Sequence, residues 1–126
     1  MKTIINTPNA PAPVGPYNQA IISNGTLYVS GQIAINPANG EIVKDTIEAE
    51  TDQVMKNVGA ILKAAGVGYE AVVKASVFVT DMGMYSRINS VYAKYFDEAT
   101  APARELVEVA NLPKYVNVEI SVIAAV

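Results

Sequence analysis

Two residue types are missing from this chain: its 126 residues include no cysteine and no histidine. Without cysteine, the chain has no disulfide framework, no thiolate nucleophile and no thiolate zinc site. Without histidine, it has no Ser-His-Asp triad and no imidazole ligand for a metal. The carboxylates show no metal-site spacing either, so we expect no metal. Any chemistry must use carboxylates, lysine, arginine, hydroxyl groups or the backbone.

Positive charge is also scarce. Nine Lys and Arg face twelve Asp and Glu, which gives a net charge of -3, and the only arginines are Arg87 and Arg104. The isoelectric point is about 4.8. Nucleic-acid binding needs clustered cations that neutralise phosphates, and here the cations are scattered along the chain. We therefore expect no nucleic-acid partner.

Long apolar runs are missing as well. No stretch of about 18 apolar residues is present to span a bilayer, and residues 1–6 lack the apolar run of a signal peptide. We expect a cytoplasmic protein with no membrane partner. There is no repeat, charged tail or long linker, so residues 1–126 are predicted to form a single domain.

Periodicity predicts six strands and two helices. Asn24-Gly25 is typical of a two-residue type I′ turn and predicts a hairpin, and four prolines make 8–16 a loop. The first helix is expected to begin near Asp45 or Thr46, where Asp45 and Glu48 resemble a capping pair, and to end at Gly66. The predicted strands span 3–6, 19–23, 26–30, 71–80, 104–109 and 116–124, and the helices span about 46–65 and 82–96.

Two helices can cover only one face of one sheet. The predicted fold class is therefore α+β, a two-layer domain with a mixed sheet of about six strands and both helices on one face. The other face is expected to mix polar residues with apolar ones such as Tyr28 and Phe78, and the mean hydropathy of +0.23 is high for a small monomer. This pattern favours a homo-oligomer that packs its open sheet faces together.

One pair of charges stands out as candidate chemistry. If the last two strands form a hairpin that turns near Leu112-Pro113, Arg104 and Glu119 become diagonal neighbours on the open face. A guanidinium matches a carboxylate bidentately, and a nearby carboxylate can move protons to and from water. The alternative is an ordinary cross-strand ion pair. In this register the opposed pairs are Arg104 with Ser121, Leu106 with Glu119, and Glu108 with Asn117.

Four other positions are weaker candidates, each with a structural alternative. Tyr17 follows a Gly-Pro turn and could line a pocket or anchor a loop. Ser30 and Gly31 end a strand where a ligand can approach the backbone, although glycine there also suits a turn. Asn89 could contact a ligand or lie on a solvated helix face. The stripe of Tyr85, Tyr92 and Tyr95 is interpreted as core rather than as a stacking platform.

The order of several motifs resembles the reactive intermediate deaminase family, also called RidA or YjgF. The resemblance covers nearly the whole chain. It rests on the segments Ala12-Pro13-Val14-Gly15-Pro16-Tyr17, Ser30-Gly31-Gln32-Ile33, Asn36-Pro37 to Gly40-Glu41, Gln53 to Asn57, Val73-Lys74 to Val79 with Asp81, Pro102-Ala103-Arg104, Val107-Glu108-Val109-Ala110 with Leu112-Pro113, and Val118-Glu119-Ile120.

This resemblance implies a chorismate mutase-like subunit that assembles as a homotrimer, with ligand clefts between adjacent subunits. It implies hydrolysis of 2-imino acids or their enamine tautomers to 2-oxo acids and ammonia, without a cofactor. Arg104 then corresponds to the residue that binds the substrate carboxylate and Glu119 to the residue that positions water. Tyr17, Ser30, Gly31, Asn89 and Leu106 correspond to substrate-binding positions.

The chain departs from the family pattern after Arg104. Many members have Ser-Cys there, whereas this chain has Glu105 and Leu106. The resemblance implies that the cysteine acts through its backbone N–H, which Leu106 keeps. Glu105 is expected to face the helices or the strand edge. The alternative is that the protein is a non-catalytic module. It would use the same cleft between subunits to bind small carboxylates or to regulate a metabolic enzyme.

Overall fold

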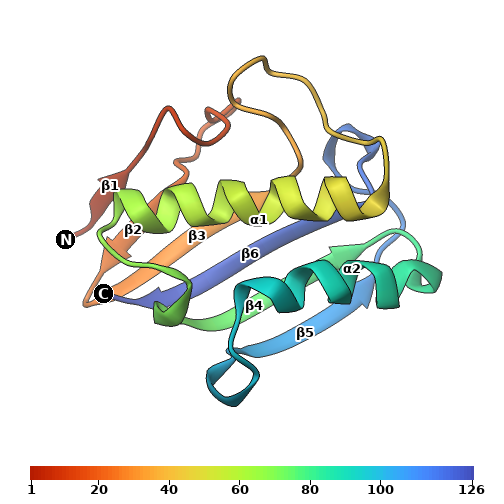
Figure 1. The fold of residues 1–126 in the computed structure, drawn as a ribbon. Helices are drawn as coiled ribbons and strands as arrows, with labels where there is room; N and C mark the ends of the chain where they lie inside the picture. The colour runs from red at the N-terminus through yellow and green to blue at the C-terminus, as the bar shows by residue number, and fades with distance from the viewer.

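The sheet and helices form two layers, as the sequence predicts. The structure is a computed structural model that describes residues 1–126. Its six strands are arranged in the order β1-β2-β3-β6-β4-β5, and α1 and α2 lie together on one face of this sheet (Figure 1). No helix has the length and apolar character needed to cross a membrane. The elements are β1 (Thr3–Ile5), β2 (Ala20–Ser23), β3 (Thr26–Gln32), α1 (Ile47–Ala64), β4 (Val72–Val79), α2 (Tyr85–Tyr92), β5 (Ala103–Glu108) and β6 (Val118–Ala125).

The predicted hairpin and first helix are confirmed. Asn24 and Gly25 have φ values of 51° and 75° between β2 and β3, as a type I′ turn requires. At the start of α1, the Thr46 hydroxyl, rather than Asp45, accepts a hydrogen bond of 3.0 Å from the Ala49 N–H. The helix ends where Gly66 adopts a φ of 83°, the position that glycine tolerates best.

The strands β5 and β6 do not form a hairpin, which corrects the prediction. The segment β4-α2-β5 is a crossover, and β5 pairs parallel with one edge of β4. The other edge of β4 pairs antiparallel with β6. A helix between two strands gives the chain the length to return parallel, as here. The three predicted pairs, Arg104 with Ser121, Leu106 with Glu119 and Glu108 with Asn117, are therefore wrong.

This topology also changes which face β5 presents. Arg104 is in register with Ala75, and Leu106 with Val77, both of which are buried beneath the helices. Arg104 and Leu106 therefore lie on the helical side of the sheet instead of the predicted open side. Glu119, between the buried Val118 and Ile120, lies on the open face as predicted.

The open face carries both apolar and charged side chains. Tyr28, Val73 and Val107 are exposed there. An irregularity in the pairing of β4 with β6, between Val72 and Lys74, turns the Val73 side chain outward. Glu105 also lies on this face, contrary to expectation, because its register partner is Ser76; its carboxylate is 2.9 Å from the Lys74 ammonium.

A buried carboxylate ties α1 to the start of β6. Glu50 is only 1% exposed. Its Oε2 accepts hydrogen bonds from the backbone N–H groups of Asn117 (2.8 Å) and Val118 (3.2 Å), and its Oε1 accepts one of 2.8 Å from the Asn117 side chain. Buried carboxylates are tolerated where donors replace water in this way. Glu50 thus holds the residues that immediately precede Glu119.

We expect Glu50→Ala to lower the free energy of unfolding by about 3 kcal/mol, because it leaves buried N–H groups without an acceptor. Urea unfolding followed by circular dichroism measures this loss. Glu48→Ala is the matched control on the same helix, since Glu48 pairs with Arg87 at an exposed site and should matter much less. Equal losses in the two variants would contradict the role assigned to Glu50.

Candidate functional site

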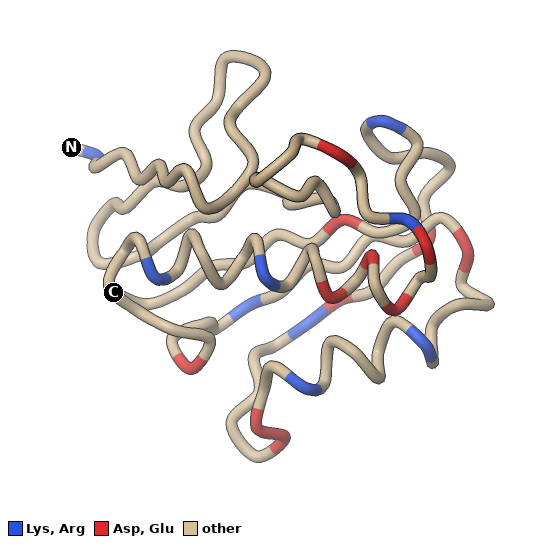
Figure 2. The backbone as a smooth tube through the Cα atoms, turned by 45° about the horizontal axis from the view of Figure 1, so that its top comes forward, with Lys and Arg blue, Asp and Glu red and all other residues tan.

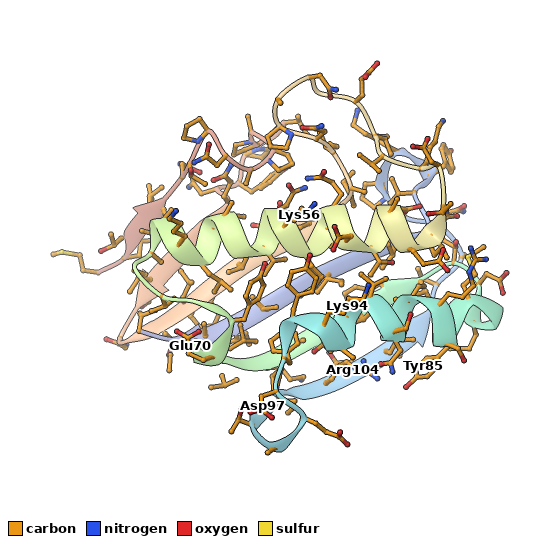
Figure 3. The ribbon with its side chains drawn as sticks, in the orientation of Figure 1. Lys56, Glu70, Tyr85, Lys94, Asp97 and Arg104 are labelled. Carbon is orange, nitrogen blue, oxygen red and sulfur yellow. The ribbon has the colours of Figure 1, made fainter.

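Arg104 is held in place by groups from α2. Its Nη1 donates a hydrogen bond of 2.7 Å to Asn89 Oδ1, and its Nη2 donates one of 3.0 Å to the Tyr85 hydroxyl. The guanidinium carbon lies 4.9 Å from the ring centroid of Tyr92, within cation–π range. Tyr85 and Arg104 are labelled together below α2 in Figure 3. Arg104 is therefore a fixed cation with donors to spare.

A cavity of about 430 Å³ opens beside this arginine on the helical side. Asn89, Tyr92, Pro102 and Arg104 are among its lining residues. The structure thus brings Asn89 and Arg104 together, as a shared site requires. The tyrosine stripe is less uniform than predicted, because Tyr85 is 38% exposed whereas Tyr92 is 6% exposed. Both tyrosines contact Arg104, and that contact was not predicted.

Glu119 occupies a different pocket, on the open face. Its carboxylate lies against Gly31: a Cβ atom placed on Gly31 would be 2.5 Å from Glu119 Oε2. Tyr17, Gly31, Lys114 and Glu119 are among the residues that line this pocket of about 110 Å³. Partial burial raises the pKa of the Glu119 carboxyl, which makes the carboxylate a stronger base.

Tyr17 lines this second pocket, whereas Ser30 lies beside it, next to Gly31 in β3. Tyr17 is about half exposed, and its hydroxyl accepts a hydrogen bond of 3.3 Å from the Val14 N–H. Ser30 donates its hydroxyl proton to the Asn18 carbonyl at 2.6 Å, so it braces the loop that carries Tyr17. The buried Gln19, which sequence reasoning missed, donates through its side-chain amide to the carbonyls of Ala10 and Pro11 and fixes the proline-rich loop.

The predicted site residues therefore form two half-sites instead of one. The arginine half-site, defined by Asn89 and Arg104, lies on the helical side of the sheet. The glutamate half-site, defined by Tyr17, Gly31 and Glu119, lies on the open face. β4 separates β5 from β6 in the sheet, so Arg104 and Glu119 are not the diagonal neighbours that the hairpin model predicted.

Leu106 lines neither of the two half-sites. Its side chain is half-buried and packs against the core under the helices, which corrects its predicted place on the open face. Nowhere in the chain do three or more acidic side chains gather as a metal site would need. Lys114 was not predicted as a site residue, because no motif or periodicity singles it out. It lines the pocket of the glutamate half-site and has a φ of 55°, a value that a non-glycine residue seldom adopts.

Residues 7–126 match the family model described as endoribonuclease L-PSP. The chain belongs to the RidA/YjgF family. Within this family, it is 44% identical over 124 residues to the 2-iminobutanoate/2-iminopropanoate deaminase of Bos taurus, covering 98% of this chain and 90% of that protein.

Other RidA/YjgF relatives agree with this assignment. A RutC family protein of Synechocystis is 54% identical over 122 residues, which cover 96% of this chain and 94% of that one. The crystal structure of E. coli TdcF with bound serine superposes with a TM-score of 0.92 at 40% identity and covers 98% of both chains. The predicted family and fold class are thus confirmed.

The contact between Gly31 and Glu119 generates one prediction. Gly31→Ala should displace the Glu119 carboxylate, since the added methyl group would occupy its position. The displaced atoms are the end of a flexible side chain, so we expect the fold to remain stable. If the chain hydrolyses 2-imino acids, as the resemblance implies, we expect the rate of that hydrolysis to fall about tenfold or more. Paired thermal melts and rates of imine hydrolysis test this. Gly40→Ala is the control: no atom lies within 4 Å of the added methyl group, but the φ of 74° there strains an alanine, so this variant should lose stability and keep its activity. Unchanged activity in Gly31→Ala would contradict the expectation.

The raised pKa of Glu119 leads to a second prediction, on how stability depends on pH. The Glu119 carboxyl keeps its proton to a higher pH in the folded state than in the unfolded state. Its contribution to stability therefore falls as the pH rises from the pKa of the unfolded state through that of the folded state. Glu119→Gln removes the charge, and we expect it to melt at a higher temperature than the wild type at neutral pH. The difference should vanish below about pH 3, where the carboxyl is protonated in both the folded and the unfolded state. A melting difference that is independent of pH would refute this account.

Proposed function

We propose that the protein hydrolyses small 2-imino acids, such as 2-iminobutanoate and 2-iminopropanoate, or their enamine tautomers, to 2-oxo acids and ammonia. The observation that carries the proposal is the Arg104 guanidinium, fixed beside a cavity with N–H donors left for a carboxylate. Two relatives that are 44% identical to this chain are named as deaminases of these imines, and TdcF binds serine, which also carries a carboxylate next to its nitrogen-bearing carbon.

We propose further that the working site lies between two subunits of a homotrimer. In one chain the arginine and glutamate half-sites lie on opposite sides of the sheet, so a ligand that touches both needs a second copy. The exposed apolar residues Tyr28, Val73 and Val107 on the open face support such packing. Arg104 of one chain would then meet Tyr17, Gly31 and Glu119 of the next.

The chemistry requires one base and one fixed cation. Arg104 binds the substrate carboxylate, and Glu119 takes a proton from water as the water oxygen bonds to the imine carbon. The imine reacts in its N-protonated form, so this addition gives a neutral carbinolamine. Glu119 then returns the proton to nitrogen, and ammonia leaves with the electron pair of the C–N bond. As the hydroxyl oxygen forms the C=O bond of the 2-oxo acid, its proton passes back to Glu119 and from there to solvent. Free imines already hydrolyse in water, so general acid–base help of about 10²- to 10⁴-fold suffices. No cofactor enters this scheme.

RNA cleavage, the activity that the family description names, receives less support from the charges. The chain carries a net charge of -3, and its Lys and Arg are spread over separate elements (Figure 2). A phosphate backbone is bound best by clustered cations. Small anionic imines and 2-oxo acids, by contrast, need only one well-placed arginine.

The activity is tested with imine generated in situ by an amino-acid dehydratase. We expect the wild type to accelerate imine loss and Arg104→Ala to reduce kcat/KM by about a hundredfold or more, as loss of a charged contact does. Arg87→Ala removes the other arginine, which pairs with Glu48 at the surface, and should remain active. Tight 2-oxo acid binding with no acceleration by the wild type would favour the non-catalytic, carboxylate-sensing alternative instead.

The shared site is tested by mixing subunits. Arg104→Ala and Glu119→Ala chains, each inactive alone, are unfolded together in equal amounts and refolded. Each interface then has one chance in four of pairing an intact Arg104 with an intact Glu119, so about a quarter of the wild-type activity should return. A mixture as inactive as its components would show that the site does not combine these residues from two chains.

A further inference from the structure

Tyr85 has a place in the arginine half-site that the family resemblance does not assign. It is the first residue of α2, and Asn89 follows it by four positions, so both side chains lie on the same face of the helix. Both contact Arg104, Asn89 through Oδ1 and Tyr85 through its hydroxyl oxygen. Figure 3 shows Tyr85 next to Arg104, below α2.

Arg104 and Tyr85 both keep hydrogen-bond donors that have no partner within the chain. A guanidinium has five N–H groups, and Arg104 gives one to Asn89 and one to Tyr85. The Tyr85 hydroxyl accepts the Arg104 bond, and within the chain it donates to no other group. Its proton therefore remains available beside the free N–H groups of Arg104. At 38% exposure, the side chain is open to a ligand.

Tyr92 offers a contrast on the same helix. Its hydroxyl is buried and has no hydrogen-bond partner, and its residue is only 6% exposed. It contributes the face of its ring to Arg104, 4.9 Å from the guanidinium carbon, whereas the Tyr85 ring is 5.8 Å away. Of the two tyrosines at Arg104, only Tyr85 presents a hydroxyl to the outside.

We propose that Tyr85 is a substrate-binding residue whose O–H donates a hydrogen bond to the same carboxylate that Arg104 binds. This inference rests on the proposed function, because it takes Arg104 as the carboxylate-binding residue. Accepting a bond from a guanidinium polarises the phenol and strengthens its own O–H as a donor. The carboxylate thus meets a cradle of guanidinium and phenol donors, and the hydrogen bond to it is charge-assisted.

The test compares Tyr85→Phe with the wild type. The variant keeps the ring and loses only the hydroxyl. We expect the dissociation constant for 2-oxobutanoate, measured by calorimetry, and the KM for the imine to rise about tenfold to a hundredfold, with kcat within about twofold, because a hydrogen bond to a charged group is lost. Tyr95→Phe is the matched control: it removes a hydroxyl that donates to Asp52, away from Arg104, and should bind as the wild type does.

A second readout separates ligand binding from simple support of Arg104. The chain has seven tyrosines, and the ¹³Cζ signal of Tyr85 in tyrosine-labelled protein is the one that Tyr85→Phe removes. Addition of 2-oxobutanoate should shift this signal as the O–H bonds to the carboxylate. Weaker binding by Tyr85→Phe without such a shift would overturn the proposal, since Tyr85 would then act only through Arg104.

The outcomes also distinguish this inference from the proposed function. If Arg104→Ala abolishes binding of 2-oxobutanoate while Tyr85→Phe binds it like the wild type, the role of Tyr85 is wrong and that of Arg104 stands. If Arg104→Ala binds and hydrolyses normally, the proposed function fails at its first step, and the role of Tyr85 fails with it.

Discussion

The crossover from β4 through α2 to β5 is the constraint on which the rest of the site depends. It places β5 parallel to β4 and leaves the other edge of β4 to β6. Arg104 consequently lies beneath α2, where Asn89 and Tyr85 can hold it. Glu119, on β6, faces the opposite side of the sheet. A single chain therefore keeps Arg104 and Glu119 on opposite sides of the sheet. Residues of α2 orient Arg104, and loop residues surround Glu119.

The two half-sites are prepared by different physical means. Arg104 is oriented by the neutral acceptors of Asn89 and Tyr85 and by the ring of Tyr92. It forms no ion pair within the chain, so its charge is left for a ligand. Glu119 is partly buried, with its carboxylate next to Gly31, and the hydration lost on burial raises its pKa. A fixed cation and a partly desolvated base suit the addition of water to a carbon next to a carboxylate. Glu50 supports the second half-site by fixing Asn117 and Val118.

Local features of the fold were predictable because they depend on neighbours in sequence. The positive φ values at Asn24 and Gly25 and the end of α1 at Gly66 follow from short-range rules. Strand pairing does not follow from them. β5 and β6 are adjacent in sequence and alternate like a hairpin, yet β4 lies between them. The contacts of Tyr85 and Glu50 were missed for the same reason, since their partners come from elements remote in sequence.

The sequence by itself determined the family, the α+β class, the coverage of one sheet face by two helices, and the residues that carry the candidate chemistry. The tertiary structure alone decided that Arg104 and Glu119 lie on opposite sides of the sheet and that Tyr85 touches the arginine. The physical reason is that residue type and periodicity report which side chains are buried and how each segment is shaped. The order of strands is set by how crossover connections and core packing close together in three dimensions.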